Sequence, residues 1–560
     1  SSVILTSIRQ LQEMGDVDSD IIRAKKVQYN SIVDSIDRLR PKPCSDPIDK
    51  LPPELFAKII RKVAAVELGP DLWYPLGHST DLFILLHLTL VSQRWMKFIT
   101  DTPTYWTFIY IDERVSDNFS KAWTCLQLSK QLPITVYIVY SAEVQRSELW
   151  RELLKHRNRI VRVVYGYNPN MPIIDSNQRF QDIMRDLFPL PALESLDYNA
   201  GGAYCLATQY VLDTFPKLRE LGDGFIVGKE HIQSLMSRNC KRISISEDLR
   251  SVWPLVESDE SLRWLRYNPS IPETNSPSST APFVKKSLNL EVLHTSRLDL
   301  PLSIGITEHI TGLVYLSVEG GLTALVRLLA SIDRLSRLQR LRLRLLIILP
   351  MTAMVDLPSS FPTNEAVKIL DLSLFQGWSR YPYESDAIDV PAALQKTRGF
   401  TSLVIRSFPA VQDLNTTFYK HQTNSLSEIA DIGEIYQLHS LQRLRIETDV
   451  PIHLSDLPPC DILTLVCSEG GNIMTLSNKK ARDVSIRYYS QGAETDCGLN
   501  DESWPCVETL IIPVELFSNT LSGFSRLRKL SLFNHDATSR ITELCYRLAI
   551  YPDLCPALES

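Results

Sequence analysis

From about residue 187 the chain repeats a short apolar pattern, and this repetition constrains its fold more than any other feature. Clear units are LPALESLDY at 190–198, LSRLQRLRLRL at 335–345 and FSRLRKLSLFN at 524–534. The anchors of ten such units are Leu196, Leu221, Leu265, Leu316, Leu341, Leu370, Leu444, Leu465, Leu510 and Leu530. Their spacings fit one, two or three multiples of about 20 to 29 residues. Ile243, Leu293, Leu403 and Ile486 are expected to fill the longer gaps.

This period is typical of leucine-rich repeats, in which each unit supplies one short strand and returns by a helix or loop. No unit can bury its apolar side chains alone, so neighbouring units must stack into one core. We therefore expect an α/β solenoid over residues 187–560, with a connecting region and irregular first repeats at 111–186. The terminal CPALES at 555–560 resembles the start of another repeat, so the natural chain is expected either to extend past Ser560 or to lack its final cap.

Composition narrows the classes of partner. The net charge of −6 comes from 59 basic and 65 acidic residues, so there is no global basic field to attract nucleic acid or an anionic membrane. Ten scattered cysteines, with no Cys-x-x-Cys pair, indicate reduced thiols in a cytoplasmic or nuclear protein. The longest apolar runs, 82–91 and 345–355, fall far short of the ~20 residues of a membrane helix.

Local motifs of catalysis are missing from the sequence. The ten histidines form no His-x-x-x-His pair, and no cysteine or histidine cluster has metal-ligand spacing. The segment Gly224 to Lys229 lacks the spacing and the hydroxyl residue of a phosphate-binding loop. We expect a non-catalytic protein that needs neither a metal nor a cofactor.

The first 110 residues have a different, helical character. Apolar spacing predicts a helical segment over 1–40, followed by the proline-rich connector PKPCSDP at 41–47. A helix then begins in IDKLPPELFAKIIRKV at 48–63, where the two prolines suit a first turn. After an insertion at 67–80, residues 81–106 carry a second apolar helical face and end in Pro-x-x-Trp.

Residues 51–106 resemble the F-box: Leu-Pro-x-Glu-Leu opens a helix, a hydrophobic helix runs into Val-Ser-x-Arg-Trp, and Pro-x-x-Trp closes the motif. With the repeats, the chain looks like a large fungal F-box family. The resemblance implies a small all-helical F-box domain at 41–110 that docks on the Skp-type adaptor of a cullin-type (SCF) ubiquitin ligase. The positions that match the family's adaptor-binding motif are Leu51, Pro52, Leu55, Ile59, Leu88, Val91 and Trp95. Trp106 is expected to pack inside the domain, and Ser92 departs from the family, which often has cysteine there.

The resemblance implies a substrate-recognition subunit whose repeats hold a protein target. Two other readings stay open. In the first, the chain is a leucine-rich-repeat scaffold that binds partners without promoting ubiquitination, and its helices only cap the solenoid. In the second, the array has a pocket for a small molecule.

Alternation along each strand indicates where a target could bind. In LQRLRLR at 338–344, Leu341 and Leu343 point inward while the three arginines point outward, onto the concave face of the array. The candidate target-binding residues are Trp264, Arg266, Tyr315, Arg340, Arg342, Arg344, Arg443 and Arg445. The same rule exposes Glu319, Arg406, Glu447, Lys529 and Phe533. Such arginines suit an acidic or phosphorylated segment, although a solvated strand face also carries charges.

Overall fold

The computed structural model describes the chain in segments that belong to two compact units. The described residues are 55, 88–112, 118–139, 147–166, 173–198, 208–222, 225, 229–245, 256, 260–267, 289–298, 300–347, 352, 355–376, 390–419, 438–448, 452–453, 459–467, 473–474, 480–488, 505–513 and 525–533. Unit 1 comprises Ser1–Thr107 with Gln127–Lys130, and unit 2 comprises Phe108–Leu126 with Gln131–Ser560. The expected helical segment 1–40 and the insertion at 67–80 lie outside these described residues.

The described part of unit 1 consists mainly of helix α6, Gln93–Thr100, and the 3-10 helix η2, Pro103–Trp106. The Ser92 side chain caps α6 by accepting a hydrogen bond from the Trp95 backbone N–H at 3.2 Å. The Trp106 indole is buried and donates a hydrogen bond to the Ile99 carbonyl at 2.9 Å. This bond fixes the chain after α6, and Trp106 packs internally as the sequence predicted.

Unit 2 is built on one sheet of 17 strands, in which every described pairing is parallel. In order of pairing, the strands are β1 (Phe108–Asp112), β2 (Ile134–Val139), β3 (Ile160–Gly166), β4 (Ser195–Tyr198), β5 (Glu220–Leu221), β6 (Arg242–Ile245), β7 (Trp264–Tyr267), β8 (Val292–Leu298), β9 (Tyr315–Gly321), β10 (Arg340–Ile347), β11 (Ile369–Gln376), β12 (Asp413–Tyr419), β13 (Arg443–Thr448), β15 (Ile462–Cys467), β17 (Asp483–Tyr488), β18 (Thr509–Pro513) and β19 (Lys529–Phe533). Each strand pairs with its successor in this series, as stacked repeats require. The sheet therefore begins at β1, well before the change of character at residue 187.

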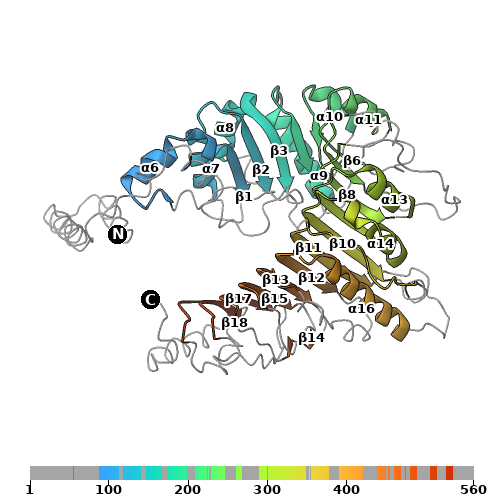
Figure 1. Ribbon diagram of the computed structural model, residues 1–560. Coiled ribbons are helices and arrows are strands. Elements are labelled where there is room, and N and C mark those ends of the chain that lie inside the picture. Colours follow the sequence, from blue (N-terminus) through green and yellow to red (C-terminus); the bar gives the residue numbers. More distant parts are fainter. Residues whose placement is uncertain are drawn as a thin grey trace. The chain divides into compact units, whose positions relative to one another are not determined.

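Helices fill many of the returns between these strands. They are α7 (Asn118–Leu128), α8 (Glu148–Lys155), η4 (Arg157–Arg159), α9 (Ile173–Leu187), α10 (Thr208–Thr214), α11 (Lys229–Met236), α13 (Leu300–His309), α14 (Leu322–Leu329), η5 (Ile332–Arg334) and α16 (Val390–Ser407). Figure 1 shows α13, α14 and α16 along one side of strands β8 to β12. Two further short strands, β14 (Ile452–His453) and β16 (Ile473–Met474), pair with each other in the later returns.

The predicted anchors form a ladder at the centre of the sheet. Most of them align in register at the first buried position of their strands, so that Leu316 pairs with Leu341 and Leu341 with Leu370. These leucines are fully buried and belong to one hydrophobic core that runs along unit 2. The strand-and-return architecture of leucine-rich repeats is thus confirmed.

Three anchor assignments need correction. Leu403, expected to fill a gap between strands, lies instead in helix α16, and the strand of that repeat is β12 with Leu414 in register with Leu370. Leu465 belongs to β15 but takes the second buried position, because Leu463 is the residue that pairs with Leu444. Ile486 likewise takes the second buried position of β17, because Val484 is the residue in register with Leu463 and Leu510. In β15 and β17 two buried apolar residues lie two positions apart, and the sequence pattern does not show which of them aligns with the neighbouring anchor.

Candidate protein-binding surfaces

The residues that match the adaptor-binding motif are partly described. Leu51, Pro52 and Ile59 lie outside the described residues. Leu55 is 48% exposed and Val91 is 57% exposed, whereas Leu88 and Trp95 are half-buried. Two exposed apolar side chains that the motif did not single out, Leu90 at 80% and Met96 at 48%, lie beside them in the sequence.

These side chains make unit 1 unusual within the described part of the molecule. Seven large hydrophobic side chains are exposed among all the described residues. Four of them belong to the few described residues of unit 1: Leu55, Leu90, Val91 and Met96. Apolar side chains concentrated in this way make this part of unit 1 a candidate surface for contact with another protein. We call Leu90, Val91 and Met96 the α6 apolar surface.

The second candidate surface is the face of the sheet opposite the leucine core, here called the open face. Burial along β10 alternates as expected, so that Arg340, Arg342 and Arg344 are half-buried between fully buried leucines. Arg443 and Arg445 on β13 are exposed, and Arg266 on β7 is half-buried. Five of these arginines thus lie on the strands β10 and β13.

Three residues expected to be exposed on this face differ from the prediction. Tyr315 is 0% exposed and Trp264 is 8% exposed, because large side chains on neighbouring strands cover each other. The His294 ring lies 5.3 Å from that of Trp264 and 4.9 Å from that of Tyr315. The guanidinium of Arg340 lies over the Tyr315 ring at 5.4 Å. Arg406 is exposed, but it belongs to helix α16 and not to a strand.

At β3 to β7 the open face is closed by a buried ionic cluster. The Asp197 carboxylate is fully buried and lies 3.2 Å from Arg162 and 3.1 Å from Arg242. The Arg242 guanidinium in turn lies over the Trp264 ring at 4.1 Å. The carboxylate has two arginine counter-charges, so removing it would be costly, and the buried cluster leaves little accessible surface on this part of the sheet.

From β9 to β13 the open face is accessible, but most of its arginines are paired. Arg340 donates two hydrogen bonds to Asp371, at 3.2 and 2.9 Å. Arg344 lies 3.4 Å from Glu319, and Arg445 lies 2.9 Å from Glu447. Arg443 binds both oxygens of Asp413. The stripe of arginines that the sequence suggested is therefore largely neutralised by carboxylates from the same and neighbouring strands.

Arg342 is the exception among these five arginines. It has no ion pair or hydrogen bond to any other residue in the described part of the chain, and its buried Nε has no acceptor. Asp371 lies beside Arg342 in register, but its carboxylate already accepts from Arg340 and Asn415. Burial, and then the neighbouring charge of Arg342, lower the pKa of the Arg344 guanidinium. A local excess of positive charge therefore remains at Arg342.

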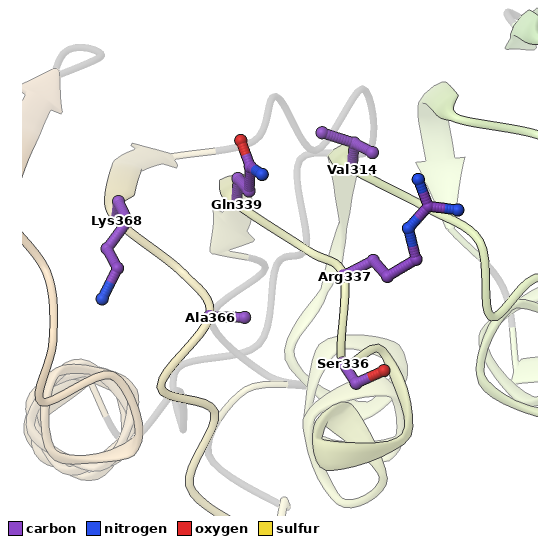
Figure 2. A pocket seen from close by; sticks show the side chains of 6 residues that line it. All are labelled: Val314, Ser336, Arg337, Gln339, Ala366 and Lys368. Carbon is purple, nitrogen blue, oxygen red and sulfur yellow. The ribbon is translucent and has the colours of Figure 1, made fainter.

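A shallow depression of about 320 Å³ lies at the beginnings of strands β9 to β11. It is lined by Val314, Ser336, Arg337, Gln339, Ala366 and Lys368. Figure 2 shows the Arg337 and Lys368 side chains extending in opposite directions. Because its two cations do not converge, this depression is a poor site for a small anionic ligand.

Other kinds of site find no support among the described residues. They contain no group of three or more His, Cys, Asp or Glu that could hold a metal ion. No described helix is long and apolar enough to cross a bilayer. Burial raises the pKa of the Cys125 thiol to about 12, which makes that cysteine a poor nucleophile.

The fold and its surfaces define a leucine-rich-repeat solenoid with two candidate surfaces for protein partners. No protein-family model matches the sequence, and no curated protein matches it. Among solved structures, a leucine-rich-repeat protein of Leptospira interrogans is similar, with 13% sequence identity and a TM-score of 0.26, over 78% of this chain and 91% of that chain. That similarity is too distant to carry an argument, so the repeat architecture rests on the strand register described above.

Proposed function

We propose that the chain is a substrate-recognition subunit of a cullin-type ubiquitin ligase. Its F-box-like residues 51–106 would dock on a Skp-type adaptor, and the solenoid would hold a protein target. The observation that carries this proposal is the coincidence of the F-box-like sequence pattern with the α6 apolar surface, since Val91 belongs to both. An exposed apolar surface in a small helical unit is expected where a permanent partner covers it.

Ser92 supports the same proposal at the position where the chain departs from the F-box pattern. Its hydroxyl caps α6 through the Trp95 backbone N–H. The cap fixes the start of the helix that follows Leu90 and Val91, so both side chains are presented at a defined place. Serine can therefore fill this position without loss of the helix.

The contribution of such a subunit to ubiquitin transfer is proximity. A target held on the solenoid, while the F-box is bound to the ligase core, meets the charged ubiquitin carrier at a raised effective concentration. This role needs no catalytic residue of its own. Its ten scattered cysteines, with no Cys-x-x-Cys pair, suit a protein that acts in the cytoplasm or the nucleus.

A repeat scaffold that binds partners without promoting ubiquitination is the second candidate. The extent of the sheet supports it, because 17 parallel strands provide a long open face whatever the helical unit does. Ubiquitination of a captured target, reconstituted with the adaptor, cullin and ubiquitin-loading enzymes, separates the two functions. The scaffold would capture the target and leave it unmodified.

The first test is co-elution of the full chain with a Skp-type adaptor in size-exclusion chromatography. We expect the wild type to form a complex and the Val91→Asp variant to bind at least about 100-fold more weakly, because a carboxylate would be buried in an apolar contact. Phe188→Asp is the matched control, since Phe188 is similarly exposed, at 49%, but lies in unit 2. Absence of a wild-type complex, or equal loss in both variants, would contradict the proposal.

A further inference from the structure

The accessible part of the open face contains two arginines whose donors are incompletely used. On strands β9 to β11 three arginines, Arg340, Arg342 and Arg344, face the two carboxylates of Glu319 and Asp371. Arg340 and Asp371 form a complete pair, with two donors on one carboxylate. Glu319 is the carboxylate left for Arg342 and Arg344, and among the described residues it contacts Arg344 and not Arg342.

The geometry of these two arginines suits one added anion. They lie two residues apart on β10, so their side chains leave the same face of the sheet about 7 Å apart. The Nε of Arg342 and the Nε of Arg344 are both buried and lack an acceptor among the described residues, so an added carboxylate would reach the terminal nitrogens instead. The two terminal nitrogens of a guanidinium form a fork that matches the two oxygens of a carboxylate.

The local charge balance also favours one added anion with a single negative charge. The two positive charges disfavour each other, and this repulsion is the second cause, after burial, of the lowered pKa of Arg344. One negative charge would balance the single unmatched arginine, whereas a dianion would overcompensate it. The outward residues in register with Arg342 and Arg344 are the small Ser317 and Ser373 respectively, which leaves room beside Arg342. The Phe375 ring lies 5.5 Å from the Arg344 guanidinium and flanks that side of the pair.

We infer that Arg342 and Arg344 form a subsite for a single carboxylate side chain, Asp or Glu, of a protein segment lying on the open face. This inference rests on the proposed function of the solenoid as a target-binding surface. It limits the expected binding site for an acidic residue to this pair of arginines, because Arg340, Arg443 and Arg445 are already paired with carboxylates. Arg342 donates the main hydrogen bonds to the acidic side chain, and Arg344 adds a second positive charge beside it.

The test is a double-mutant cycle on the full chain. A random peptide library displayed on phage is selected on the wild-type protein, and the binding of the selected peptides is measured by fluorescence anisotropy. We expect an acidic residue in the selected peptides, and we expect its replacement by the neutral amide, Glu→Gln or Asp→Asn, to weaken binding about tenfold, as for one charge-assisted hydrogen bond. The same replacement should change binding less than about twofold in the Arg342→Gln variant, because the partner charge is gone.

The matched control is Arg443→Gln. Arg443 is another outward arginine, but it is paired with Asp413 and should leave the peptide's Glu→Gln penalty intact. Arg342→Gln removes no hydrogen bond or ion pair within the described fold, and glutamine keeps much of the side chain, so its circular dichroism should equal that of the wild type. The inference is overturned if the library yields no binder, if acidic residues are not enriched, if a phosphoserine in place of the acidic residue binds better, or if the penalty survives in Arg342→Gln.

Failure of this subsite and failure of the ligase function are distinguishable. Adaptor binding is measured through the α6 apolar surface in unit 1, and it does not involve Arg342. A normal adaptor complex with no carboxylate preference would remove only the subsite. A clear carboxylate preference with no adaptor complex would instead leave a peptide-binding scaffold.

Discussion

At the scale of single residues, Asp197 shows how a buried charge restricts its neighbours. Its carboxylate lies between Arg162 and Arg242 and also directly over Gly222, where an added Cβ would meet Asp197 Oδ1 at 1.4 Å. Any side chain at position 222 must displace the carboxylate. Displacement would leave two arginines without their buried counter-charge, which is among the costliest changes that a core can suffer.

We therefore expect Gly222→Ser to lower the free energy of unfolding by about 3 kcal/mol. Gly321→Ser is the matched control, since a Cβ at Gly321 meets nothing within 4 Å and a serine there could cap α14. That variant should stay within about 0.5 kcal/mol of the wild type. Urea denaturation followed by circular dichroism measures both. Similar losses in the two variants would show that Asp197 moves aside at little cost.

The accessible arginines show which properties of a residue follow from the sequence. Period-two alternation gives the direction of the β10 side chains, with Leu341 and Leu343 buried and the arginines turned outward. It gives neither exposure nor ionic partners, because these come from other repeats: Asp371 is 31 residues from Arg340. For the same reason Tyr315 was expected to be exposed, although His294 and Arg340 on adjoining strands cover it.

At the scale of elements, the start of α6 depends on one hydroxyl. We expect Ser92→Ala to cost about 1 kcal/mol, because the Trp95 N–H loses its acceptor. Ser92→Asp should retain most of the stability, since aspartate also caps helices. For each variant we would measure the temperature of unfolding and the affinity for a Skp-type adaptor. If the alanine and aspartate variants lose stability and affinity equally, the hydroxyl acts through some contact other than the cap.

The repeat elements were largely predictable, since the leucine anchors are both the sequence signal and the physical core. Leu341 and Leu370 align as expected because each buries against its neighbours on both sides. Early repeats were harder to recognise. In β1 to β3 the first buried positions hold Ile109, Val136 and Val163, which continue the same ladder to Leu196 without the leucine pattern.

At the scale of the whole molecule, unit 2 has one continuous core but only neighbour-to-neighbour strand pairings. Each repeat is thus stabilised by the two repeats beside it, and stability should vary along the array and not be shared uniformly. The described strands from β13 onward have more exposed outward residues than β4 to β9, where Asp197, Arg242 and Tyr315 are buried. Amide exchange should therefore be slower in β4 to β9 than in the strands from β13 onward.

Leu343→Ala tests this locality. Leu343 is 0% exposed on β10, and its truncation should cost about 3 kcal/mol in that repeat. In hydrogen-exchange mass spectrometry we expect faster exchange in β9, β10 and β11, and much smaller changes in β2 and β3, because the perturbation weakens with each interface it crosses. Val163→Ala on β3 is the matched variant, and in it the faster exchange should appear in β2, β3 and β4 instead. If either substitution accelerates exchange equally in all 17 strands, the solenoid unfolds as one cooperative unit and the nearest-neighbour description is wrong.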